Sequence, residues 1–211
     1  IMRQQTMAVV IAGVVLAGSV GAAEPQPPDG ARKANLTTLV FSEDFADINK
    51  AIDLNNTKKE GFSFYLSRPF GYPVTSPDAV SVSAGVLTLQ NPVNCAQFDL
   101  CSAAKLGEGK WVGFAHRGAA YYEAAIAFDP EQKVTKGYPS FWTMSAEHLF
   151  DTARVQTPGW EKEGWRYQFL ENDFMEWNYD WHTKEEYLHS LHVWTNHKRP
   201  GAQVSNGSEQ W

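Results

Sequence analysis

The sequence has few cysteines and no excess of positive charge. Its 211 residues include two cysteines, and 18 lysines and arginines stand against 24 aspartates and glutamates, which gives a net charge of −6. Nucleic-acid binding depends on clustered lysine and arginine, so this balance argues against a nucleic-acid partner. No cysteine and histidine spacing is typical of a zinc site. We therefore predict no metal ligands and no required cofactor, with a structural calcium ion left open.

Long apolar runs are also missing. The longest run, Ala8 to Val20, is shorter than the about 20 residues of a membrane-spanning helix. It follows Arg3 and ends at small residues up to Ala23, which is typical of a signal peptide over residues 1–23. A buried or anchoring helix is the alternative. We predict a secreted or periplasmic protein that has no membrane contact after cleavage, and a proline-rich linker over residues 24–35.

Export affects how the two cysteines are interpreted. Cys95 and Cys101 bracket a five-residue loop. In an oxidising compartment such a pair favours a local disulfide. A pair of free thiols is the alternative.

Sustained helical periodicity is the third absence. From Leu36 onward, apolar residues alternate at period two in short bursts separated by glycine, proline, asparagine and aspartate, which predicts an antiparallel all-β domain over residues 36–211. Two such sheets packed face to face would form a β-sandwich. Residues 200–210 show no strand character, so we expect the sandwich to be incomplete at the C-terminus. The expected strands are Thr38–Phe41, Phe62–Leu66, Val80–Leu89 around a Gly85 turn, Trp111–Ala115, Ala120–Phe128, Ser140–Met144, Tyr167–Trp177 and His189–Trp194.

Aromatic residues, in contrast, are abundant. The chain has eight tryptophans and eight tyrosines. Such side chains bury large areas in protein cores. Their flat faces also stack on the apolar faces of sugar rings, so they serve either the core or a carbohydrate-binding surface.

One expected strand carries three acids within six residues: Glu171, Asp173 and Glu176. At period two, Glu171 and Asp173 share a face, whereas Glu176 points to the opposite one. One extra residue at Phe174 or Met175 would return Glu176 to the face of the other two acids, and such bulges are common beside active sites. The spacing predicts a bulged strand with three carboxyls on one face.

Three carboxyls on one face repel one another, which makes a purely structural role costly. Retaining glycosidases use this arrangement, because they need a nucleophilic carboxylate and a carboxylic acid about 5 to 5.5 Å apart. A neighbouring negative charge raises the pKa of the acid and keeps it protonated. The alternative is an exposed strand whose acids are simply solvated.

The pattern Glu-x-Asp-x-x-Glu resembles the signature of glycoside hydrolase family 16, which includes laminarinases, lichenases, agarases and carrageenases. The resemblance extends in order from Leu39 to Trp194. It implies a concanavalin A-like jelly roll and retaining endo-hydrolysis of a β-linked polysaccharide. The segments that carry it, besides the acidic strand, are Leu39–Phe45, Val80–Gln90, Tyr121–Ala124 and Gly137–Met144.

The same resemblance implies roles for the acids. Glu171 matches the nucleophile, Asp173 the residue that orients and tunes the pair, and Glu176 the general acid/base.

Substrate contacts follow from the resemblance as well. Trp142 matches a cleft tryptophan that stacks on sugar, and Glu123 matches a cleft carboxylate that accepts hydrogen bonds from sugar hydroxyls. His192 is similar to a histidine on the strand after the catalytic one, with His189 as the rival for that position. Trp177 is a further candidate for substrate binding. Core packing is the alternative for Trp142, and surface exposure for Glu123 and His192.

Two other functions fit the same residues. A non-catalytic, lectin-like sandwich would use the tryptophans without needing three aligned carboxyls. A calcium-binding domain would use the three acids as oxygen ligands. We expect the hydrolase to be a monomer whose substrate is a polysaccharide, and a neutral β-glucan fits the acidic balance and the tryptophan content. The four histidines and the basic residues between His182 and Arg199 would suit an anionic galactan, or they form a plain solvated surface.

Overall fold

Strands make up most of the regular structure, and helices are few and short. This holds in the computed structural model of the chain, which describes residues 9–12, 26–66, 74–90, 99–107, 110–127, 139–145, 168–177, 186–195 and 207–210. The prediction of an all-β chain is confirmed at this level. No helix in these ranges has the length and apolar character to span a membrane.

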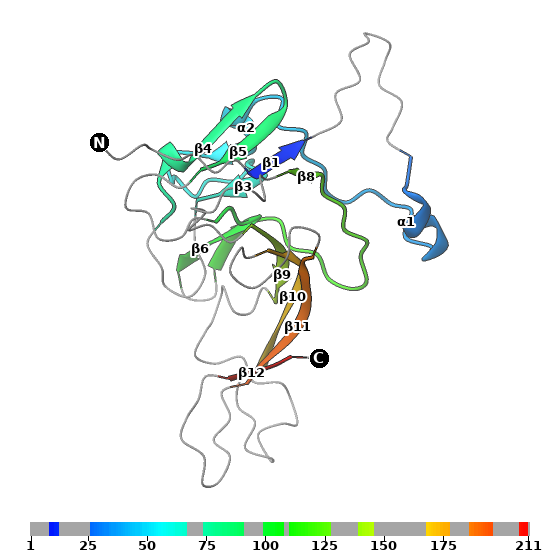
Figure 1. Cartoon of the computed structure of the whole chain (residues 1–211). Coiled ribbons are helices and arrows are strands. Elements are labelled where there is room, and N and C mark those ends of the chain that lie inside the picture. Colours follow the sequence, from blue (N-terminus) through cyan, green and yellow to red (C-terminus); the bar gives the residue numbers. More distant parts are fainter. Residues whose placement is uncertain are drawn as a thin grey trace, which may run out of the picture.

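The first sheet has four antiparallel strands in the order β4-β5-β1-β8 and lies at the top of Figure 1. The hairpin of β4 and β5 forms one side of this sheet, and its turn residues Ala84 and Gly85 both have positive φ, 50° and 72°. A two-residue turn of this kind matches the twist of the strands it joins. The strands are β1 (Val9–Ala12), β4 (Val80–Ser83), β5 (Val86–Leu89) and β8 (Ile126–Ala127).

Strand β1 belongs to the segment predicted to be a signal peptide. It pairs with β5 on one side and with β8 on the other. Cleavage after Ala23 would remove β1 from the sheet. The leader stays a prediction.

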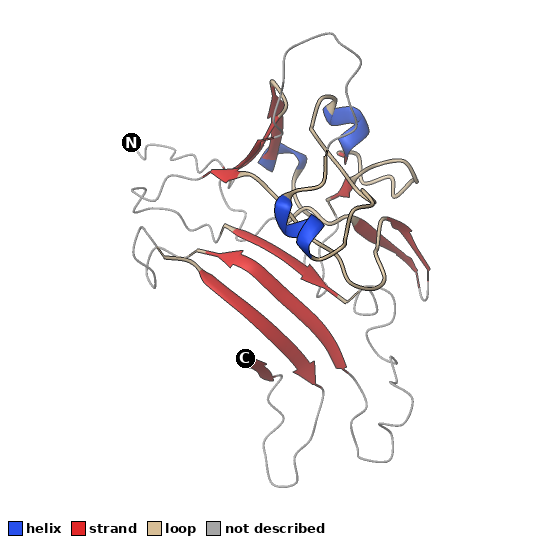
Figure 2. Cartoon of the chain, turned by 90° about the vertical axis from the view of Figure 1, so that its right-hand side faces the viewer, coloured by secondary structure: helices blue, strands red, loops and turns tan. Residues whose placement is uncertain are grey.

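The second sheet holds the acidic strand. Four antiparallel strands lie in the order β12-β11-β10-β9, and β9, β10 and β11 run side by side as the long strands of Figure 2. The strands are β9 (Ser140–Met144), β10 (Gln168–Glu176), β11 (Leu188–Thr195) and β12 (Gly207–Gln210).

Predicted and observed strands agree best in this second sheet. Strand β9 has the predicted bounds, and β10 and β11 differ from theirs by one residue at each end. The expectation that residues 200–210 lack strand structure is wrong, because β12 pairs with β11 at the sheet edge. An edge strand needs only backbone N–H and C=O groups to pair, so it can form without apolar alternation.

Three other predicted strands are wrong or shortened. Thr38–Phe41 is not a strand, and Leu39 and Val40 are exposed there. Phe62–Leu66 reduces to two strand residues, and within the described part of Ala120–Phe128 only Ile126–Ala127 is a strand. Apolar alternation therefore predicted more strand residues in these three segments than the structure pairs, since alternation alone does not supply a partner strand.

Two small strand pairs complete the β structure. Strands β2 (Ile52–Asp53) and β3 (Phe64–Tyr65) form a short parallel pair, whereas β6 (Ala103–Gly107) and β7 (Lys110–Gly113) form an antiparallel hairpin. The predicted strand Trp111–Ala115 corresponds to β7, shifted toward the N-terminus.

The helices are single turns with local caps. Helix α2 (Ile48–Ala51) begins after Asp47, whose side chain accepts a hydrogen bond from the N–H of Asn49 at 3.0 Å. A carboxylate there satisfies a backbone donor at the helix N-terminus. The 3₁₀ helix η2 (Pro77–Ala79) is capped in the same way by Ser76.

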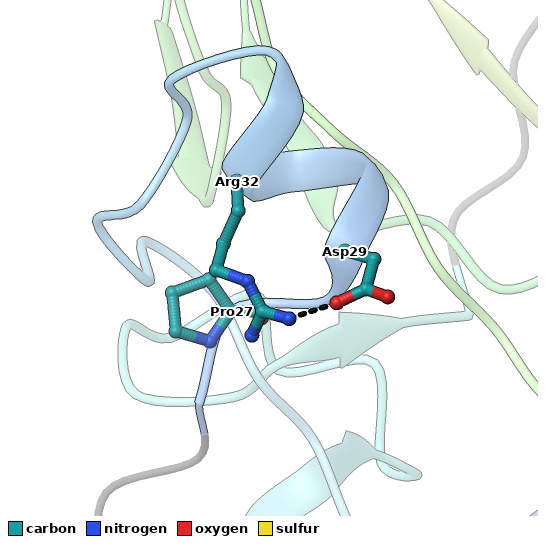
Figure 3. A network of polar contacts seen from close by, with 3 residues as sticks. All are labelled: Pro27, Asp29 and Arg32. Atoms are coloured by element: carbon teal, nitrogen blue, oxygen red, sulfur yellow. Dashed lines mark hydrogen bonds and ion pairs between the residues drawn. The ribbon is translucent and has the colours of Figure 1, made fainter.

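Helix α1 (Asp29–Lys33) lies in the segment predicted to be a linker. Arg32 closes its turn, because its guanidinium donates to the carbonyl of Pro27 at 2.9 Å and forms an ion pair with Asp29 (Figure 3). Asp29 in the first turn and Arg32 in the last turn also have the signs that favour a helix dipole.

The main apolar core lies between the β4–β5 hairpin and helix α2. A smaller cluster lies under the β6–β7 hairpin and contains Tyr65, Ala104 and Val112. Burial of such side chains contributes roughly 1.5 to 3 kcal/mol each. The buried members of the main core are Phe45, Ala51, Ile52, Leu66, Ala79, Val80 and Leu87.

Candidate active site

Strand β10 contains the bulge that the acid spacing predicts. On the β9 side, the ladder advances two residues from Asp173 to Met175 while its partner advances one, to Phe141. On the β11 side, it advances three residues from Asp173 to Glu176 while its partner advances two, to Leu188. One extra residue on β10 accounts for both shifts. The prediction of a bulge at Phe174 or Met175 is confirmed.

The bulge places all three acids on one face of the sheet. Residues directly opposite each other on antiparallel strands point to the same side. Glu171, Asp173 and Glu176 therefore share their face with the residues paired to them. We call this the acid face; it consists of Met144, Glu171 and His192 in one row, Trp142, Asp173 and Ser190 in the next, and Ser140, Glu176 and Leu188 in the third.

Asp173 lies at the centre of a polar cluster on this face. It is buried, with 1% of its surface exposed. Its Oδ2 lies 2.9 Å from Nε2 of His192, and its carboxyl shares a hydrogen bond with that of Glu176. Asp173, Glu176 and His192, which we call the Asp173 cluster, each place one donor atom within 4.8 Å of the other two.

Burial raises the pKa of the Asp173 carboxyl to about 6. The negative charge of Glu176 contributes to this rise in pKa, while His192 acts in the opposite direction. A carboxyl of this kind keeps its proton well above the pH at which an ordinary aspartic acid loses it. The shared proton lets two carboxyls lie in contact without full charge repulsion.

The structure brings two of the other predicted residues to the acid face. Glu171 is half-buried and pairs with Met144 and His192 on either side. Trp142 is also half-buried and pairs directly with Asp173. His192, rather than its rival His189, reaches the acids, because His189 is an odd number of positions away and is exposed.

Two other predicted contacts are not members of the Asp173 cluster. Glu123 is exposed in an extended segment and accepts a hydrogen bond from the hydroxyl of Tyr121 at 3.3 Å. Trp177 is 2% exposed, and its backbone N–H donates to the carbonyl of Pro139 at 3.0 Å. Protein atoms cover the ring of Trp177, so it offers no face for sugar stacking in this structure.

The predicted disulfide cannot be placed. Cys95 lies outside the described residues. Cys101 is half-buried, and its backbone pairs with that of Tyr65 in both directions, at 2.8 and 3.0 Å. The pairing of the two cysteines stays a prediction.

Sequence reasoning missed Ser190, a polar residue of the acid face. Ser190 is 4% exposed, and its Oγ has no hydrogen-bond partner in the described part of the chain. It pairs directly with Asp173. The only signal for it is the pairing register of β10 and β11, which a single strand does not reveal.

The site can do two kinds of chemistry. Carboxyls held in contact at different protonation states can exchange protons with a bound substrate. Two carboxylates and one imidazole can also hold a cation, and the residues that would do so are Asp173, Glu176 and His192.

No protein-family model, curated protein or solved structure matches this chain. The resemblance to glycoside hydrolase family 16 therefore stays a prediction from the quoted motifs. Function has to be inferred from the acid face itself.

Proposed function

We propose that the protein is a secreted retaining endo-glycoside hydrolase that cleaves a β-linked polysaccharide. The observation that carries this proposal is the β10 bulge, which returns Glu176 to the face of Glu171 and Asp173. If this sequence alternated regularly, without the bulge, Glu176 would lie on the other side of the sheet from the acids with which it has to act. A strand whose acids were only solvated would have no need of the bulge.

The proposed reaction has two steps. Glu171 attacks the anomeric carbon while Glu176 protonates the departing glycosidic oxygen, which gives a covalent glycosyl-enzyme. Glu176 then removes a proton from water, and this water releases the sugar from Glu171. Two inversions at the same carbon give net retention.

Asp173 lies on β10 between the proposed nucleophile, Glu171, and the proposed general acid/base, Glu176. Its buried carboxyl shares a hydrogen bond with Glu176 and holds its proton up to a pH of about 6, which is its raised pKa. Such a neighbour fixes the position of the Glu176 carboxyl. When Asp173 ionises, its charge favours the protonated form of Glu176, which is the form that the first step needs.

Substrate recognition is proposed to use the half-buried ring of Trp142 beside Asp173. Glu123 would accept hydrogen bonds from sugar hydroxyls at another subsite. A neutral β-glucan or an anionic galactan would lie across the acid face of a concanavalin A-like jelly-roll sandwich, of which β9 to β12 would form one sheet.

A screen of the purified protein for release of reducing ends tests the activity. The substrates are laminarin, lichenan, agarose, carrageenan and xyloglucan. We expect Glu171→Gln and Glu176→Gln each to lower turnover of the active substrate at least about 10³-fold. The matched control is Glu60→Gln, since Glu60 is exposed in the turn before β3, and it should retain full activity. Unchanged turnover in Glu171→Gln would refute the assignment.

Covalent trapping separates the two glutamates. A 2-deoxy-2-fluoro glycoside with a good leaving group slows the second step, so the sugar should accumulate on the peptide that contains Glu171. Mass spectrometry should find no adduct in Glu171→Gln. If the protein binds a polysaccharide but neither turns it over nor becomes labelled, the lectin-like alternative is correct.

A further inference from the structure

Two carboxylate oxygens and one imidazole nitrogen converge in the Asp173 cluster. The carboxylates of Asp173 and Glu176 and the imidazole of His192 place one atom each within 4.8 Å of one another. Metal–ligand bonds of about 2.0 to 2.2 Å put two ligands of one ion about 3 to 4 Å apart. The 2.9 Å between Oδ2 of Asp173 and Nε2 of His192 is close to this spacing.

A buried hydroxyl beside the cluster points independently to a ligand. Ser190 is 4% exposed and faces Asp173 across the ladder. Its Oγ has no hydrogen-bond partner among the described residues. A buried polar group without a partner is destabilising, and such groups are rare in folded proteins. An ion in the cluster, or a water bound to that ion, would give this hydroxyl its partner.

The imidazole decides between classes of cation. Calcium and magnesium take oxygen ligands almost exclusively. Zinc and similar divalent ions accept imidazole and carboxylate together, with three protein ligands and one open position. We propose that Asp173, Glu176 and His192, with Ser190 beside them, bind one divalent ion of the zinc class.

Such an ion would oppose the proposed hydrolysis. Ligation requires ionised carboxylates and a neutral imidazole. It also occupies the lone pairs of Glu176 that have to carry the proton to the glycosidic oxygen. Zinc should therefore inhibit turnover, whereas the binding itself does not depend on the protein being a hydrolase.

Titration calorimetry of the full chain with zinc chloride, after removal of bound metal with a chelator, tests the site. We expect one ion per chain, and no comparable binding of calcium chloride. His192→Ala should weaken zinc binding at least 100-fold. The matched control is His189→Ala, on the same strand but exposed and on the opposite face, and it should bind as the unmodified chain does. Absence of binding, or equal loss in both variants, would overturn the proposal.

Two further measurements keep the test independent of how one variant folds. Glu176→Gln should also weaken zinc binding at least 10-fold. In the unmodified chain, zinc should shift the imidazole ¹⁵N resonances of His192 among the six histidines, and a shift at another histidine alone would contradict the site. Zinc binding without hydrolysis leaves this site standing and refutes the proposed function, whereas hydrolysis without zinc binding does the reverse.

Discussion

Two buried aspartates, Asp53 and Asp173, have the same exposure and opposite surroundings. Each is 1% exposed. Oδ1 of Asp53 accepts hydrogen bonds from the backbone N–H and the hydroxyl of Thr57, both at 2.9 Å, and Oδ2 accepts one from the N–H of Lys58 at 2.6 Å. All of these donors come from the turn that follows β2, so the carboxylate stabilises its own loop.

Asp173 instead contacts two titratable side chains. Its carboxyl contacts that of Glu176 and the imidazole of His192. Burial and a like charge raise its pKa, which means that the ionised form is destabilised in the fold. The comparison teaches that burial alone does not distinguish a structural acid from a functional one. The chemical identity of the partners does.

The largest difference should appear in activity. Asp173→Asn should lower turnover of the polysaccharide about 10²-fold or more, because the amide cannot take up or release a proton beside Glu176. Asp53→Asn should leave the turnover number of the folded fraction unchanged. Initial rates normalised to folded protein measure both effects. Equal losses in the two variants would show that Asp173 has only a structural role.

Stability should show the opposite order. Asp53→Ala removes the acceptor of three hydrogen bonds and should lower the free energy of unfolding by about 3 kcal/mol. Asp173→Asn at pH 7 should be neutral or stabilising, because it removes a buried carboxylate that repels Glu176. Urea denaturation followed by tryptophan fluorescence compares the two. A larger loss in the Asp173 variant would break the comparison.

The pH dependence of stability sharpens the contrast. In the fold, Asp173 has a pKa of about 6, above the ordinary value of 3.8, so between these values the native state holds a proton that the unfolded chain has lost. The contribution is present below about pH 4 and is lost as the pH rises through 6. Relative to Asp173→Asn, the unmodified protein should lose roughly 2 kcal/mol between pH 4 and pH 7. The measurement is made with a chelator present. A stability difference between the two proteins that does not change with pH would contradict the prediction.

The smallest effect should come from a single donor to Asp53. Thr57→Val keeps the backbone N–H bond but removes the hydroxyl that donates to Oδ1. Because one of three hydrogen bonds is lost, we expect a loss of about 1 kcal/mol in the free energy of unfolding. Thr57→Ser, which keeps the hydroxyl, is the control and should lose less.

The sequence predicted the acidic strand well because its signals are local. Alternating apolar residues identified β9 and β10, and the odd spacing from Asp173 to Glu176 required a bulge. The turn at Gly85 was also predicted from the sequence, since a tight hairpin needs residues that tolerate positive φ. Each of these features depends on a few consecutive residues.

The remaining features depend on pairing between distant segments. Thr38–Phe41 has the composition of a strand but pairs with no strand in the described part of the chain, whereas β12 has a polar composition and pairs through its backbone with β11. The contact of His192 with Asp173 and the position of Ser190 follow from the register of β10 against β11. Spacing along the chain could not predict a cluster whose third member comes from the next strand.

The extra residue in β10 also controls what the end of the strand presents to each side. Successive residues of a strand point to opposite faces of the sheet, so one added residue reverses the face of every residue that follows it. Removing Met175 would take the extra residue out of the ladder, so β10 would alternate regularly and Glu176 would stay opposite Ser140 on the face of Asp173. Inserting one further residue after Met175, with the bulge kept, would instead turn Glu176 to the side of Leu191, so the gain of a single codon would separate this acid from Asp173.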